Sequence, residues 1–154
     1  MPVAAIPVGY HSVTAHITVN DAAAAIAFSQ AAFAATELFR MEMGPGVIGH
    51  AEIKMGDSHV MLSDEFPDRG VVSPQTLGGS TSHLMIDCDD CDALFARAIA
   101  AGAKALRPME NQFYGDRSGQ VTDPFGHRWS LSTHLKDVST EEMKRRMAAM
   151  MGGN

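Results

Sequence analysis

A tandem repeat constrains this chain more than any other feature of its sequence. The same order of elements, a strand, a helix and three further strands, is predicted twice at an offset of 69 residues. The candidate helix caps Asp21 and Asp90 are 69 residues apart, and so are Gly56 and Phe125 in the turns of the final hairpins. Because a strand, a helix, a breaker and a hairpin match in the same order, internal duplication explains the pattern better than chance.

The first copy covers residues from about 13 to 64. Residues 14–20 alternate between apolar and polar side chains, which predicts a half-buried strand. Asn20 or Asp21 then caps an alanine-rich helix that runs to about Ala35. Three strands are predicted at about 36–43, 47–55 and 58–63, with glycine-containing turns at 44–46 and 56–57.

The second copy covers residues from about 81 to 134. Residues 82–88 alternate again, Asp89 or Asp90 caps a second helix, and Gly102 ends it. Strands are predicted at about 105–110, 119–122 and 127–134. The sequence Asp-Pro-Phe-Gly at 123–126 suits a type I turn between the last two.

The segments outside the copies are a linker and a terminal helix. Residues 65–80 carry two prolines and three glycines and are predicted to be a linker. Ser139 and Glu142 have the spacing of a capping box, which predicts a C-terminal helix over 139–151. Met143, Met147 and Met150 share one side of that helix. We expect residues 10–138 to form one α+β domain, with tandem βαβββ repeats making a curved mixed-sheet cup.

Composition excludes several classes of protein. The chain has 154 residues, of which 45% are hydrophobic and 19% charged, as in an ordinary globular domain. A net charge of −6 without a cluster of Lys or Arg makes a nucleic-acid partner unexpected. No apolar stretch approaches the roughly 20 residues that span a membrane. Cys88 and Cys91 are interpreted as reduced thiols which, with no signal peptide apparent, favour a cytoplasmic location.

One face of the predicted strands carries an unusual mixture of side chains. The other face is apolar and is expected to pack against the helix of its copy. The mixed face holds His, Ser, Thr and Met where a solvated face would carry Lys and Glu, which favours a concave ligand site over a partly filled core. Tyr114 and Arg117 belong to the loop at 113–117, which either lines the mouth of this site or is a turn in which Asp116 and Arg117 fix the loop. The candidate ligand-binding residues are His16, His59, Met61, His83, Met85, Tyr114, Arg117, Ser130, Ser132 and His134.

The duplicated βαβββ unit resembles the vicinal oxygen chelate superfamily, which includes glyoxalase I, extradiol dioxygenases, and fosfomycin and bleomycin resistance proteins. The marker is the run from Tyr114 to Trp129, with its element Asp-Pro-Phe-Gly-His-Arg-Trp at 123–129. Together with Ser132-Thr133-His134 and the segment 139–143, it is similar to the PhnB-like branch. The segment 32–41 fits that branch too, except that Ala34 stands where a glycine is usual.

The resemblance also implies where a divalent metal would bind. Mapped onto this chain, the four usual ligand positions fall near Thr14, Met61, His83 and Ser130. Only His83 is a normal ligand, because a thioether and two neutral hydroxyls bind such ions poorly. The sequence therefore predicts no resident metal. A shifted site made from His16, His59, His83 and His134 is the competing hypothesis.

These observations favour a metal-free protein that binds a small molecule, with resistance or sequestration as its role. The alternative is a metal-dependent lyase, isomerase or dioxygenase that uses the histidines of the cup, so whether the chain is an enzyme stays open. A third hypothesis gives the methionine-rich terminal helix a docking role. The resemblance further implies a homodimer, and an exposed sheet edge in each copy gives a physical reason for one.

Overall fold

The computed structural model describes residues 2–153. In it, the first copy forms one four-stranded sheet. Its strands are β1 (Ala15–Val19), β2 (Thr36–Gly44), β3 (Val47–Met55) and β4 (Ser58–Asp64). They lie in the order β1-β4-β3-β2, and β1 is parallel to β4 whereas the other pairs are antiparallel. We call this sheet one.

The second copy repeats this topology as sheet two. Its strands are β5 (His83–Asp87), β6 (Lys104–Asn111), β7 (Asp116–Thr122) and β8 (Arg128–His134), in the order β5-β8-β7-β6. Again the first strand is parallel to the last and the remaining pairs are antiparallel. The predicted α+β fold of tandem βαβββ units with a C-terminal helix is confirmed. One difference is that β7 begins at Asp116, before the predicted residue 119.

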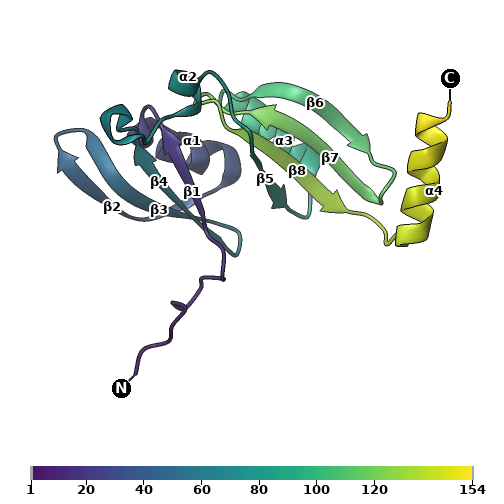
Figure 1. The fold of residues 1–154 in the computed structure, drawn as a ribbon, viewed down its shortest axis with the longest axis horizontal. Helices are drawn as coiled ribbons and strands as arrows, with labels where there is room; N and C mark the ends of the chain where they lie inside the picture. Colours follow the sequence, from purple (N-terminus) through teal and green to yellow (C-terminus); the bar gives the residue numbers. More distant parts are fainter. Residues whose placement is uncertain (1, 154) are drawn as a thin grey trace.

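One helix covers each sheet. The helices are α1 (Ala22–Phe33) and α3 (Cys91–Ala100). The predicted caps are present, since Asp21 accepts a hydrogen bond from the backbone of Ala24 and Asp90 accepts one from that of Ala93. Figure 1 shows both helices behind the sheets, with β1 and β5 at the edges that face each other. The copies are joined through contacts between α1 and α3.

The core is continuous across the two copies but unequally divided between them. Most of the buried hydrophobic side chains belong to copy one. Phe33 at the end of α1 lies 5.0 Å, centroid to centroid, from the Trp129 ring of β8, and Phe28 lies 6.1 Å from Phe125. Trp129 is almost fully buried, as expected for a residue on the helix-facing side of its strand.

The linker contains two short helices that the sequence analysis did not predict. These are η1 (Pro67–Arg69) and α2 (Pro74–Leu77), and each has a proline in its first turn. Segments of three or four residues are too short to show a helical period. The side-chain amide of Gln75 donates to the carbonyl of Pro124, 2.6 Å away. Gly126 has a φ of 89°, and a Cβ there would lie 2.8 Å from that of Pro74, so both the turn and the packing require glycine.

The terminal helix α4 (Thr140–Met151) extends beyond sheet two (Figure 1). Ser139 caps it as predicted, while the carboxylate of Glu142 pairs with Arg145 and Arg146. Three of its methionines, Met147, Met150 and Met151, are 49%, 67% and 80% exposed. No helix within residues 2–153 combines the length and the apolar character that crossing a membrane requires.

Candidate functional site

The candidate site comprises the open faces of the two sheets and the seam between them. The open face of a sheet is the face opposite its helix. Two cavities lie along the seam between β1 and β5. A cavity of about 380 Å³ is lined by His16, His83 and His127, and one of about 600 Å³ by His59, Met85 and Asp87, among others. Both volumes are within the range of small-molecule sites.

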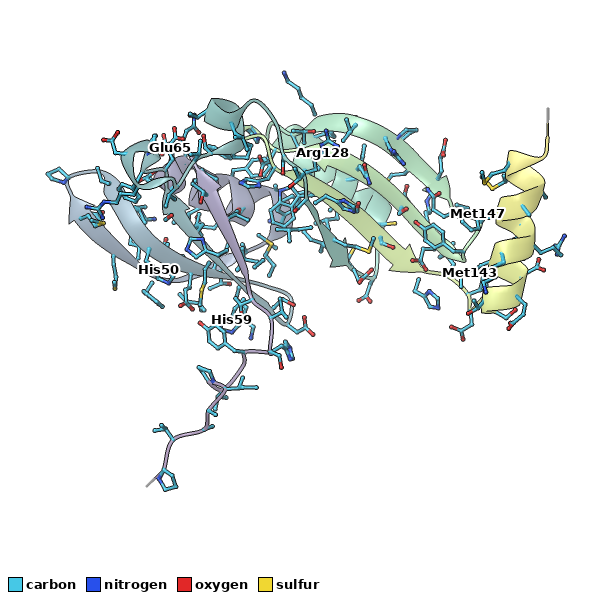
Figure 2. All side chains as sticks on the ribbon, in the orientation of Figure 1. His50, His59, Glu65, Arg128, Met143 and Met147 are labelled. Carbon is cyan, nitrogen blue, oxygen red and sulfur yellow. The ribbon has the colours of Figure 1, made fainter. Side chains whose placement is uncertain are left out.

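The open face of sheet one gathers three predicted residues with two that the sequence analysis missed. His16 and Met61 are direct partners across β1 and β4, and Glu52 of β3 is the partner of Met61 on its other side. The rings of His16 and His50 lie 5.8 Å apart. Figure 2 labels His50 and His59 on this sheet.

A buried carboxylate lies at the centre of that face. Glu52 is only 6% exposed, and its Oε1 accepts a hydrogen bond from Nε2 of His50 at 3.2 Å. Its Oε2 lies 3.9 Å from Nδ1 of His59, too far for a hydrogen bond. These two buried atoms, Glu52 Oε2 and His59 Nδ1, have no hydrogen-bond partner among the described residues. Burial, followed by the charge of His50, lowers the pKa of His16, which favours a neutral imidazole there.

The open face of sheet two brings four of the predicted residues together. His83, Met85, Tyr114 and Ser130 line a cavity of about 390 Å³. The Ser130 hydroxyl accepts a hydrogen bond from the side-chain amide of Gln120 at 3.0 Å, and the hydroxyls of Tyr114 and Ser118 lie 3.4 Å apart. Met150 of α4 also lines this cavity. Amides and hydroxyls suit recognition of a neutral polar group.

The remaining predicted residues are placed differently. Ser132 and His134 lie at the end of β8, where Asp116 accepts from both side chains, at 3.5 Å and 2.6 Å. Nε2 of His134 contacts Asp137 at 2.9 Å. Hydrogen bonds to Asp116 and then Asp137 raise the pKa of His134. Because both its nitrogens face carboxylates, His134 is poorly suited to act as a general base.

Arg117 points away from the open face of sheet two. It alternates with Asp116 and Ser118 along β7, and its Nε donates to Asp92 of α3 at 2.7 Å, on the helix-covered side. A second donor of the same guanidinium reaches Asp92 at 2.8 Å. Arg117 is therefore engaged in joining β7 to α3.

The sequence analysis missed His50, Glu52 and Tyr10 because it considered mainly the first and last strands of each copy. The sequence did contain a pattern that could have identified His50 and Glu52. With Ala51 between them, they continue the alternation within 47–55 and lie on the mixed face. The aromatic ring of Tyr10 lies 4.0 Å from that of His59. Its position could not be predicted because residues before 13 show no regular pattern.

The four family positions for a divalent metal do not fit such an ion in this chain. Ser130 is engaged by Gln120, Met61 supplies a thioether, and Thr14 a neutral hydroxyl. Within residues 2–153, no group of three or more His, Cys, Asp or Glu side chains has the geometry to hold a metal ion.

The family model of the Glyoxalase/Bleomycin resistance protein/Dioxygenase superfamily matches residues 10–131. The chain belongs to this superfamily. It is 38% identical over 141 residues to uncharacterized proteins of Mycobacterium bovis and Mycobacterium tuberculosis H37Rv. These matches cover 90% of this chain and 93% and 83% of the relatives.

Several solved structures share the fold of this chain. TioX from Micromonospora sp. ML1 superposes with a TM-score of 0.64 at 22% identity, covering 84% of this chain and all of TioX. The fosfomycin resistance protein FosX from Mesorhizobium loti has a TM-score of 0.60 at 18% identity, covering 86% and 95% of the two chains. A PhnB protein from Bacillus cereus has a TM-score of 0.60 at 19% identity, covering 80% and 99%.

Proposed function

We propose that this member of the superfamily is a small-molecule-binding protein that works without a resident metal, in sequestration or resistance. The observation that carries the proposal is the lining of the seam and open faces. Histidine, methionine, serine and aromatic side chains line cavities of about 380 to 600 Å³, which have the size of small-molecule sites and combine apolar surface with polar groups. The cytoplasmic location stays a prediction from the sequence.

The donor chemistry supports binding over metal-dependent catalysis. An isomerase, lyase or dioxygenase of this superfamily would need a divalent ion held by several His or carboxylate ligands. His83 is the one ordinary ligand among the four mapped positions. His16, His83 and His127 line one seam cavity, but Nε2 of His127 donates to the carbonyl of Thr18 at 2.8 Å. That histidine is therefore engaged in joining the two copies.

Retained ligand and metal can be measured together on untagged protein. We expect native mass spectrometry to find a bound organic molecule, or a thermal-shift screen of small aromatic and aliphatic compounds to find stabilising ones. Met85→Glu should weaken such binding because it places a charge at the seam, whereas Lys144→Ala on α4 should not. Stoichiometric metal in elemental analysis, lost in His83→Ala, would contradict the proposal and favour an enzyme.

The proposal includes a homodimer. A folded monomer of 16.5 kDa exposes about 7,500 Å². This chain exposes 9523 Å², roughly 2,000 Å² more. Large exposed apolar side chains contribute to the excess on both sheets and on α4, among them Met41, Met85 and Met150. Obligate dimers bury about this much surface per subunit, so a second copy is the partner that the surface suits.

A further inference from the structure

Two buried atoms on the open face of sheet one, Glu52 Oε2 and His59 Nδ1, have no hydrogen-bond partner among the described residues. Neither the fold nor the superfamily accounts for this pair. Burial of a carboxylate oxygen without a donor costs several kcal/mol in general. The nearby imidazole of His50 satisfies only Oε1, at 3.2 Å. A buried acceptor that stays unsatisfied within the fold therefore points to a donor supplied from outside it.

The separation of the two atoms suits one shared donor group. At 3.9 Å apart, they are too distant to bond each other, yet one nitrogen can lie at hydrogen-bond distance from both. In its Nε2–H tautomer, His59 presents Nδ1 as an acceptor. Two acceptors, one of them a carboxylate, match a nitrogen that carries a positive charge and at least two N–H donors.

The surroundings suit the same charge. The Tyr10 ring lies 4.0 Å from the ring of His59, and Phe39 lies 5.8 Å from His50. Aromatic faces attract organic cations. A cavity of about 500 Å³ adjoins Glu52 and is lined by Tyr10, Met61 and Thr14, among others. Tyr10 belongs to the segment before β1, which is fixed by a turn from Pro7 rather than by strand pairing.

We propose that this face binds the protonated amine or guanidinium group of an organic ligand, with Glu52 as the counter-charge and His59 as a second acceptor. Tyr10 moves aside to admit the group and then contacts it. The inference rests on the proposed small-molecule function and gives the ligand a chemical class: an organic cation with N–H donors and an apolar body.

Four probes that share a phenyl ring separate charge from hydrogen bonding. They are benzylammonium, benzyltrimethylammonium, benzyl alcohol and benzoate, titrated into the full-length protein and followed by the amide NMR signals of β3 and β4. We expect saturable binding of benzylammonium, about tenfold weaker binding without N–H donors or without charge, and no binding of benzoate. Equal affinity for benzyl alcohol, or no saturable shift with benzylammonium, would overturn the inference.

A charge-matched pair of variants tests the counter-charge. Glu52→Gln keeps the shape of the side chain and should weaken benzylammonium about tenfold or more. Glu141→Gln removes the same charge from the exposed first turn of α4, which lines none of these cavities, and should leave the affinity unchanged. Equal loss in both variants would show non-specific attraction and contradict the site. If Glu52→Gln does not fold, the wild-type preference among the four probes decides.

The outcomes also separate this inference from the function on which it rests. Binding of neutral or anionic probes at the seam, without binding of benzylammonium at sheet one, would leave the proposed function standing and refute the inference. Benzylammonium binding that perturbs β3 and β4 and depends on Glu52 supports both.

Discussion

At the scale of single residues, Ala34 and Asp123 give a physical reason for two sequence features on which the resemblance rests. Ala34 is the non-glycine residue with positive φ in residues 2–153, at φ 55° and ψ 31°, where it ends α1. The left-handed conformation costs an L-residue roughly 1–2 kcal/mol. The backbone conformation at position 34 therefore favours the glycine that the resemblance leads us to expect there.

We predict that Ala34→Gly stabilises the protein by about 0.5–1 kcal/mol. The gain is the relieved strain less the greater backbone entropy of glycine in the unfolded chain. Denaturant unfolding measures it, and Ala27→Gly, at an exposed position inside α1, should instead destabilise by about 1 kcal/mol. A loss of stability in Ala34→Gly would contradict the strain argument.

Asp123 explains the Asp-Pro-Phe-Gly-His-Arg-Trp element at 123–129. Its Oδ1 accepts from the backbone of Phe125 and His127, each at 2.9 Å, and its Oδ2 accepts from Nε1 of Trp129 at 2.9 Å. Burial raises the pKa of Asp123, against the opposing effect of these donors. One carboxylate therefore fixes the turn and orients the tryptophan that joins sheet two to α1.

Asp123→Asn should destabilise the fold by about 2–3 kcal/mol, because the new NH₂ group would face the indole donor of Trp129. Equilibrium unfolding gives this value directly. In the background of Trp129→Phe, which removes the indole donor, the same substitution should cost clearly less. Additive effects of the two substitutions would show that the hydrogen bond to Trp129 is not the cause.

At the scale of elements, the position of α4 depends on charged contacts rather than on a core. His134 at the end of β8 contacts Asp116 of β7 and Asp137, just before α4. Arg146 of α4 donates to the carbonyl of Phe113 at 2.8 Å. These contacts are exposed, so each is worth little by itself and is sensitive to salt.

The His134 contacts should make stability depend on pH. Because its pKa is raised in the folded protein, His134 contributes stability that is fully present below the unfolded value of 6.5 and is lost as pH rises through the folded pKa. The difference in unfolding free energy between wild type and His134→Gln should therefore shrink from pH 6 to pH 9. His11→Gln in the exposed N-terminal segment serves as the control. A difference that does not vary with pH would contradict the pairing.

The elements themselves were largely predictable from sequence, whereas the site was only partly so. Alternation and capping residues located the eight strands and three longer helices of residues 2–153, because strand faces and helix ends impose local patterns on the sequence. The pairing of Arg117 with Asp92 and the burial of Glu52 depend on which strands become neighbours and on side-chain direction. Strand neighbours and side-chain directions are set by tertiary packing, which local sequence patterns do not predict.

At the scale of the whole molecule, the exposed surface predicts a dimer, with the methionine side of α4 in the interface. Figure 2 shows Met143 and Met147 on this helix, at the end of the molecule away from sheet one. Covering the exposed parts of Met147 and Met151 contributes about 1–2 kcal/mol each. The double variant Met147→Lys/Met151→Lys should therefore weaken dimerisation tenfold or more.

Light scattering coupled to size-exclusion chromatography measures the expected mass of twice 16.5 kDa. Lys144→Glu, a charged substitution elsewhere on α4, is the control for a general charge effect. A monomeric wild-type protein at micromolar concentration would refute the dimer. A dimer unaffected by the double methionine variant would move the interface to the sheets.

Because the core is divided unequally between the two copies, the copies depend on each other to different extents. Copy one holds most of the buried apolar side chains, whereas copy two depends on Phe28 and Phe33 of α1 to cover Phe125 and Trp129. The main-chain carbonyls of Gln30 and Ala31 in turn accept from Arg97 of copy two. We therefore predict that copy one folds first and presents the apolar surface on which copy two packs. During synthesis, a chain of which only copy one has left the ribosome would expose the apolar surface of α1 until copy two is made and covers it.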